Sequence, residues 1–144
     1  MVSTKLIGKL FVSRQKEIDR YAKEAEAIQE HVFRKLIQTA AATEWGKKYN
    51  YANIRTYTDF QRVPIQQYDD VKGYVDRMRH GEKNILWPGQ VVWYAKSSGT
   101  TNDKSKFILS AKTDYANIHY KGGTDAVALY LRSNPQSNFF SGKG

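Results

Sequence analysis

Residues 91–109 read VVWYAKSSGTTNDKSKFIL and hold the most informative pattern in the chain. β-Branched and aromatic side chains fill Val91–Ala95, which is typical of a strand. A polar stretch from Ser97 to Ser105 interrupts this pattern, and Lys106–Leu109 is apolar enough to return as a second strand. The sequence therefore predicts two strands that bracket a polar loop.

The composition of this loop suits an anion. Hydroxyl side chains bracket Gly99, and lysines follow them. Small residues let backbone N–H groups approach a phosphate, hydroxyls donate hydrogen bonds to its oxygens, and an ammonium group offsets its charge. The loop does not fit the GxxxxGK[ST] motif, because Lys104 and Ser105 stand where that motif has its second glycine and its lysine. The competing interpretation is an ordinary polar hairpin loop, since Ser, Thr, Asn and Asp favour turns for reasons of their own.

Helices are expected before the two strands. Apolar residues recur at steps of three and four from Ile18 to Ala40, which predicts a long amphipathic helix that ends near Trp45. Thr58-Asp59 is expected to cap a short helix that stops before Pro64, because the residue ahead of a proline disfavours helical angles.

Further helices are expected on both sides of the strands. One runs from Tyr68 to His80 and starts with Asp69-Asp70, which suits the positive end of the helix dipole. Another spans about residues 111–132, carries Gly122-Gly123 inside it and ends at Asn134-Pro135. The expected fold is α/β, with amino-terminal helices, a β-loop-β phosphate-binding segment and a following helix.

Residues 92–108 resemble the first nucleotide-binding motif of the Gretchen Hagen family, the auxin-responsive acyl acid–amido synthetases of the adenylate-forming superfamily. Four further segments look like parts of that family: 43–49 (TEWGKKY), 60–65 (FQRVPI) with Tyr68 after it, 81–89 (GEKNILWPG) and 119–123 (HYKGG). The resemblance thus covers nearly the whole chain. It departs from the pattern at Asn102-Asp103, where many superfamily members have a glycine, so we expect a stiffer and more acidic loop.

The resemblance implies an ATP-dependent ligase that also uses Mg²⁺. A carboxylic acid is activated by ATP as an acyl-adenylate while pyrophosphate leaves, and an amine, usually of an amino acid, then takes the acyl group and releases AMP. No residue of this chain is implied as nucleophile, general base or metal ligand, so its part is positioning and electrostatics. The residues implied to hold the phosphates are Ser97, Ser98, Gly99, Thr100, Thr101 and Lys106.

Members of that family are several times longer than this chain. The resemblance therefore implies that residues 1–144 are the amino-terminal portion of a larger adenylate-forming domain, truncated, with the remainder of the same enzyme as partner. The residues that hold adenine and ribose would lie beyond Gly144, and we expect the isolated chain to be inactive.

Composition limits the other classes of function. The net charge is +9, but Lys and Arg are spread along the chain and no block of like charge reaches five residues, so we expect no nucleic-acid partner. No apolar run approaches the roughly eighteen residues that a membrane helix needs, and no membrane partner is expected. With no cysteine there is no thiol chemistry, and the cytoplasm is the expected compartment. Two alternatives stay open, a small basic nucleic-acid-binding module and a catalytically inactive fragment.

The aromatic residues near the loop have two possible uses. Trp87, Trp93 and Tyr94 could stack on a nucleotide base, but large aromatic side chains more often pack in a core. We expect core packing for all three.

Overall fold

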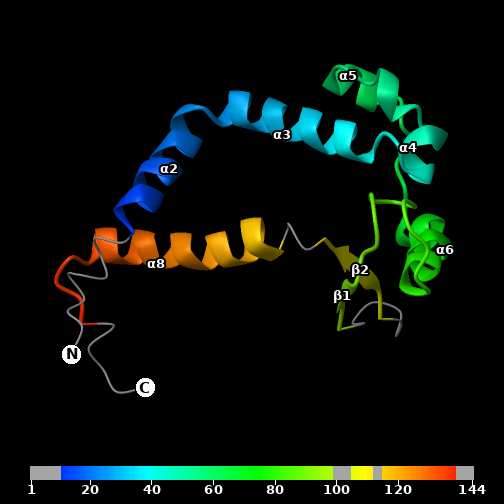
Figure 1. Ribbon diagram of the computed structural model, residues 1–144. Coiled ribbons are helices and arrows are strands. Elements are labelled where there is room, and N and C mark those ends of the chain that lie inside the picture. The colour runs from blue at the N-terminus through cyan, green and yellow to red at the C-terminus, as the bar shows by residue number, and fades with distance from the viewer. Residues whose placement is uncertain (1–10, 99–104, 112–114, 139–144) are drawn as a thin grey trace. The chain divides into compact units, whose positions relative to one another are not determined.

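The computed structural model describes residues 11–98, 105–111 and 115–138. The chain divides into two compact units, residues 1–29 with 114–144 and residues 30–113, and each is described by itself. In chain order (Figure 1) the elements are α2 (Val12–Lys23), α3 (Ala25–Ala40), α4 (Glu44–Lys48), a 3₁₀ turn (Tyr51–Asn53), α5 (Tyr57–Phe60), α6 (Tyr68–Arg79), β1 (Trp93–Lys96), β2 (Phe107–Ser110), a π-helical stretch (Tyr115–Tyr120) and α8 (Lys121–Ser133).

The described chain is mostly helical, with a single antiparallel hairpin of β1 and β2. The predicted order of helices, two strands and a following helix is confirmed. Within the described ranges, no helix combines the length and the apolar character that crossing a membrane requires.

The first predicted helix is in fact two helices and a short third one. α2 ends at Lys23 and α3 begins at Ala25, because Glu24 leaves helical geometry with φ −119° and ψ 27°. A single non-helical residue barely shifts the apolar spacing, so periodicity alone does not reveal it. The predicted end near Trp45 is also wrong, since α3 stops at Ala40 and Trp45 belongs to α4.

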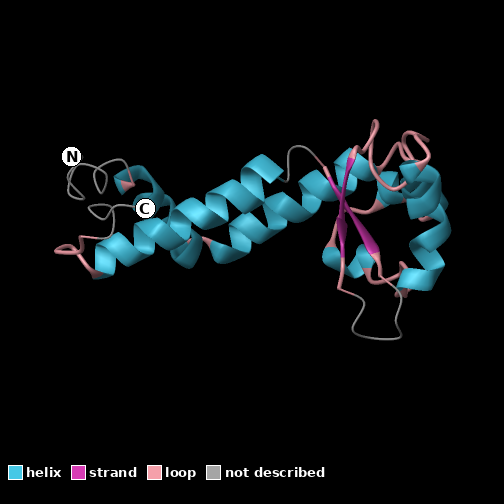
Figure 2. Ribbon diagram, turned by 90° about the horizontal axis from the view of Figure 1, so that it is seen from below, coloured by secondary structure: helices cyan, strands magenta, loops and turns pink. Residues whose placement is uncertain are grey.

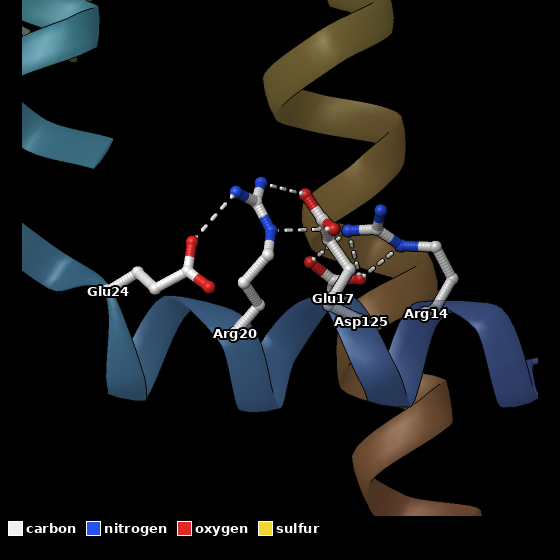
Figure 3. Close-up of polar contacts among 5 residues, drawn as sticks. All are labelled: Arg14, Glu17, Arg20, Glu24 and Asp125. Carbon is white, nitrogen blue, oxygen red and sulfur yellow. Dashed lines mark hydrogen bonds and ion pairs between the residues drawn. The ribbon is translucent and has the colours of Figure 1, made fainter. Parts of the chain in front are cut away.

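Ionic contacts join α2 to α8 in the first unit. Arg14 donates two hydrogen bonds of 2.8 Å to the carboxylate of Asp125, the bidentate geometry in which Arg binds a carboxylate best (Figure 3). This contact raises the pKa of Arg14. Arg132 lies 2.6 Å from Asp19, and Ala128 on α8 is fully buried. The two helices therefore pack through an apolar contact with ion pairs at its rim.

Further ion pairs lie along α2 and its C-terminal cap, Glu24. Arg20 donates to Glu17 at 2.7 Å and to Glu24 at 3.3 Å, at spacings of three and four residues (Figure 3). The Arg20 hydrogen bond lowers the pKa of Glu17. Such pairs stabilise the helix that carries them rather than its packing.

Thr43 organises the turn between α3 and α4 in the second unit. Its hydroxyl donates to the Ala40 carbonyl at 2.7 Å and accepts from the Gly46 N–H at 3.0 Å, so it caps α4 while fully buried. The turn is tight, because a Cβ at Gly46 would lie 2.1 Å from the Ala40 oxygen. The Trp45 N–H then donates to the Ile85 carbonyl at 3.0 Å, which fixes α4 against the segment before the hairpin.

The next two helices begin with capping boxes. α5 is capped by Thr56, two residues before the predicted Thr58, and Asp59 completes the capping box. Asp59 accepts from the Thr56 hydroxyl and from the backbone N–H groups of Thr56 and Arg55, and these bonds lower its pKa. α6 begins after Gln67, whose N–H donates to Asp70 at 2.7 Å. The predicted α6 is confirmed, with Tyr68 as its first residue.

The core of the second unit lies between α6 and the hairpin. Its buried centre consists of Met78, Ile85 and Val91. The hairpin lies beside α6 in both orientations of the ribbon (Figures 1 and 2). Partly buried residues pack around that centre: Tyr74, Leu86, Trp87, Tyr94 and Leu109.

The prediction of core packing holds for two of the three aromatic residues. Trp87 and Tyr94 pack against the core cluster, whereas Trp93 is 62% exposed. Neighbouring residues of a strand point to opposite faces, and α6 covers the face on which Tyr94 lies. Trp93 is on the other face, so the prediction for it was wrong.

The helix after the hairpin, α8, includes the glycine pair within its regular geometry. Gly122 and Gly123 lie in the first turn of α8, and a Cβ at either would meet nothing within 4 Å. They neither break the helix nor admit another backbone. The predicted end is confirmed, because Asn134 caps α8.

Candidate phosphate-binding site

The hairpin holds the two ends of the polar loop opposite each other. β1 and β2 are antiparallel, and Lys96 pairs with Phe107 at the last step of the ladder. Beyond that pair the Ser97 N–H donates to the Lys106 carbonyl at 2.9 Å, and the Lys106 N–H donates to Ser97 Oγ at 2.9 Å. The strands therefore continue as a pair up to the mouth of the loop (Figure 2).

The structure brings together those predicted site residues that it describes. Ser97 lies opposite Lys106 in the hairpin, and the next residue, Ser98, is exposed. The other predicted residues, Gly99, Thr100 and Thr101, lie outside the described residues.

The chemistry of this mouth suits an anion. A hydroxyl has one donor and two acceptor lone pairs, and Ser97 Oγ spends one lone pair on the Lys106 N–H. Its proton can still be donated, as an oxygen of a phosphate requires. The Lys106 side chain is exposed and its ammonium lies 5.5 Å from the centre of the Tyr68 ring. A hydroxyl donor and an exposed lysine thus lie at the two ends of the loop, opposite each other in the hairpin.

Tyr68 positions the second strand. Its hydroxyl accepts a hydrogen bond of 2.9 Å from the Phe107 N–H, so the first residue of α6 is tied to the first residue of β2. In the first strand, the Tyr94 hydroxyl donates to the carbonyl of Val91, three residues earlier, at 3.0 Å. Burial raises the pKa of Tyr94, which keeps that hydroxyl protonated. Tyr68 was predicted to begin a helix, but its contact with β2 has no local signal in the sequence.

A hollow of about 430 Å³ opens beside the mouth of the loop, and we call it the basic hollow. Its lining residues are Tyr68, Lys72, Asp76, Arg79, Lys96, Ser105 and Phe107. Three of these are cations and one is an acid. The Arg79 guanidinium carbon lies 3.6 Å from the centre of the Phe107 ring, and Arg79 pairs with Asp76 at 3.2 Å.

The sequence contained a signal for the α6 side of this hollow. Tyr68, Lys72, Asp76 and Arg79 follow one another at steps of four, four and three residues, so they share one face of the helix. What the sequence did not contain is the pairing of that face with the hairpin. Lys96 was overlooked for the simpler reason that it precedes the hydroxyl run of the loop.

A larger, apolar hollow of about 590 Å³ lies in the same unit, and we call it the apolar hollow. Tyr68 and Phe107 line both hollows. Most of its other lining residues are aliphatic or aromatic, among them Phe33, Leu36, Val75, Trp87, Ile108 and Leu109.

The described part of the chain offers no cluster of three or more His, Cys, Asp or Glu residues that could hold a metal. His31 is exposed on α3, and His80 caps the end of α6.

Comparison with known proteins gives a family match. The GH3 family N-terminal domain matches residues 14–144. An indole-3-acetic acid-amido synthetase GH3.8 from Oryza sativa subsp. indica is 28% identical over 99 residues, which are 67% of this chain and 16% of that relative. A jasmonoyl–L-amino acid synthetase GH3.3 from Oryza sativa subsp. japonica is 26% identical over 95 residues, 65% of this chain and 21% of the relative.

A solved structure has the same fold. The GH3.15 acyl acid amido synthetase aligns over 100% of this chain and 24% of its own length, with a TM-score of 0.77 and 19% sequence identity. The chain thus spans about a quarter or less of each of these three proteins.

Proposed function

The chain belongs to the GH3 family, and on that premise we propose that its hairpin loop binds the phosphates of ATP in an acyl acid–amido synthetase. The observation that carries the proposal is the pairing of Ser97 with Lys106. Their backbone and hydroxyl bonds hold a hydroxyl donor and an ammonium group at the mouth of a loop rich in small and hydroxyl residues.

The reaction we propose has two steps. An oxygen of the substrate carboxylate forms a bond to the α-phosphorus of ATP, the bond from that phosphorus to the bridging oxygen breaks, and pyrophosphate leaves. The nitrogen of an amine then bonds to the acyl carbon and loses a proton. The bond from the acyl carbon to the phosphate oxygen of AMP breaks, and AMP leaves with its electron pair.

The residues of this chain would take part by binding alone. Ser97 and Ser98 would donate hydrogen bonds to phosphate oxygens, together with Gly99, Thr100 and Thr101 of the loop, and Lys106 would offset the charge. Donors held in place before the reaction stabilise charge that develops in the transition state. Magnesium would offset further phosphate charge, and we assign no ligand for it to the described residues.

The names of the relatives suggest which substrates the enzyme uses. One relative is named for indole-3-acetic acid and another for jasmonate joined to an L-amino acid. We propose a small carboxylic acid and an amino acid as the substrates of the enzyme to which this chain belongs.

We also propose that residues 1–144 form the amino-terminal portion of a larger adenylate-forming domain. Two observations support this. The chain spans 16% and 21% of the two relatives named above, and the apolar hollow of about 590 Å³ leaves large side chains such as Leu36 (49%) and Ile108 (57%) exposed. The occupant we propose for the apolar hollow is a later segment of the same enzyme, because apolar surface of this extent is rarely left uncovered.

The test is ATP–pyrophosphate exchange by the protein as its source produces it, with indole-3-acetic acid or jasmonic acid as the acid. Intact mass comes first, since a mass well above 16.6 kDa identifies the longer enzyme. Lys106→Ala and Ser98→Ala are expected to lower exchange by about tenfold to hundredfold, because each removes a hydrogen bond to a charged group.

The matched control is Lys35→Ala, which removes an exposed ammonium from α3 and should leave exchange unchanged. Normal exchange in Lys106→Ala would remove that lysine from the site. A mass of 16.6 kDa together with no exchange would favour a catalytically inactive chain, and binding of ATP would then be the only activity left to test.

A further inference from the structure

We propose that the basic hollow is a second anion site, which holds the terminal phosphates of the polyphosphate and then the departing pyrophosphate. This inference rests on the proposed function, because it assumes that the neighbouring loop binds the phosphates of ATP. The residues assigned to it are Lys72, Arg79 and Lys96, with Ser105 at its edge.

Position is the first argument. Lys96 directly precedes Ser97, and Ser105 directly precedes Lys106, so both ends of the loop run into the basic hollow. The hollow therefore adjoins the described ends of the loop. At about 430 Å³ the hollow is more than ten times the roughly 30 Å³ that one water occupies in the liquid, which leaves room for two phosphate groups.

Charge is the second argument. Three cations line the hollow and Asp76 is its one lining acid. Asp76 forms an ion pair with Arg79 at 3.2 Å. The ammonium groups of Lys72 and Lys96 therefore have no second acid among the described lining residues to neutralise them. A multiply charged anion is the ligand that such a balance favours.

The placement of Arg79 is the third argument. Its guanidinium group stacks at 3.6 Å on the Phe107 ring, and Phe107 is held in turn by the hydroxyl of Tyr68. A guanidinium has five N–H donors in a rigid plane, and a stacked one loses little conformational freedom when it binds a phosphate. Arg79 is therefore oriented before any ligand arrives.

The chemistry of the first step explains why such a site is useful. When the bond between the α-phosphorus and the bridging oxygen breaks, the electron pair stays on the pyrophosphate and its negative charge grows. Cations placed at the terminal phosphates rather than at the α-phosphate stabilise that growing charge. The cations of the hollow would thus stabilise the leaving group in addition to the loop.

The test measures binding of inorganic pyrophosphate to the 144-residue chain by isothermal titration calorimetry. Lys72→Gln and Arg79→Gln should each weaken binding by about tenfold, the effect of losing one hydrogen bond to a charged group. Asp76→Asn should have the opposite sign and tighten binding by up to about fivefold, because it removes the one acid of the lining. Lys35→Gln, an exposed charge on α3, should leave binding unchanged.

Unfolding in urea is measured for each variant, since Arg79 also packs on Phe107. Lys72 is exposed, so a change of affinity in Lys72→Gln without a change of stability reports on the ligand alone. Weaker binding after Asp76→Asn, or unchanged binding after Lys72→Gln, would overturn the second site.

The same titrations separate this inference from the proposed function. If Ser98→Ala and Lys106→Ala weaken pyrophosphate binding but the hollow variants do not, the loop stands and the second site is refuted. If the unsubstituted chain binds no pyrophosphate, the second site is refuted, and the loop is then judged by the exchange assay alone.

Discussion

Replacing Gly46 by alanine should destabilise the second unit. A Cβ at this position would lie 2.1 Å from the Ala40 oxygen and 2.9 Å from the Ala40 carbon and the Ala41 Cα. All three are backbone atoms, so no side chain can rotate away. The oxygen contact is about 1.3 Å short of the 3.4 Å at which ordinary contact begins.

The size of the effect follows from what the displaced carbonyl does. The Ala40 oxygen accepts from the Thr43 N–H at 3.0 Å and from the Thr43 hydroxyl at 2.7 Å. Overpacking costs about 1–3 kcal/mol, and each weakened hydrogen bond costs about 1 kcal/mol. We expect Gly46→Ala to lower the free energy of unfolding by about 3 kcal/mol, a large share of the typical 5–15 kcal/mol of a domain.

Gly73 is the matched control. It lies in α6, is exposed, and a Cβ there would meet nothing within 4 Å. Alanine is the better helix former, so Gly73→Ala should raise the free energy of unfolding by about 0.5–1 kcal/mol. The same chemical change is thus expected to have opposite signs at the two positions.

The assay is urea unfolding followed by far-UV circular dichroism, with the urea dependence of the free energy compared among the three proteins. An unchanged dependence means that the midpoint reports on stability alone. If Gly46→Ala unfolded within about 0.5 kcal/mol of the unsubstituted chain, the usual range for surface substitutions, the close approach of α4 to the end of α3 would be refuted.

Three further changes test other parts of the fold. Thr43→Val keeps the size of the side chain but removes the cap of α4, and should lower the free energy of unfolding in urea by about 1–2 kcal/mol. Arg77 donates a hydrogen bond to Glu44 and lowers the pKa of that carboxyl from the ordinary 4.5. This contact therefore stabilises the fold above pH 4.5, and the stabilisation is lost as the pH falls through the lowered pKa. Arg77→Gln should make the free energy of unfolding depend less on pH in that range, measured from pH 7 to pH 3. A double-mutant cycle of Arg14→Met and Asp125→Asn should give a coupling of about 1 kcal/mol, and a coupling near zero would contradict the bidentate contact between α2 and α8.

Local signals in the sequence predicted the parts of the fold that local chemistry decides. α6 begins at Tyr68, as its acids indicated, and ends at Arg79, one residue before the predicted His80, and the hairpin has the predicted two strands. The end of α3 was missed because the apolar spacing continues through Ala40 to Trp45. The turn at Thr43 depends on a backbone contact, Gly46 against the Ala40 carbonyl, that periodicity cannot express.

The same distinction holds for the site. Ser97 and Lys106 belong to one continuous stretch, so the sequence could propose them together, and the hairpin does bring them together. Lys72 and Arg79 were visible only as one face of a helix. Their relation to the loop depends on the hydrogen bond from Phe107 to Tyr68, which joins residues 39 positions apart.

The position of the loop therefore depends on residues that no ligand would touch. The Trp45 N–H bonds to the Ile85 carbonyl, Ile85 packs with Met78 and Val91, and Val91 leads into β1. Unfolding of the turn at the end of α3 should release the loop through this chain of contacts. Gly46→Ala changes no residue of the loop or of the basic hollow. The variant is accordingly expected to bind pyrophosphate more weakly at urea concentrations where the unsubstituted chain is still folded. Its binding should return when the urea is removed. Loss of affinity that persisted without urea in a fully folded Gly46→Ala chain would instead mean that the turn shapes the site directly.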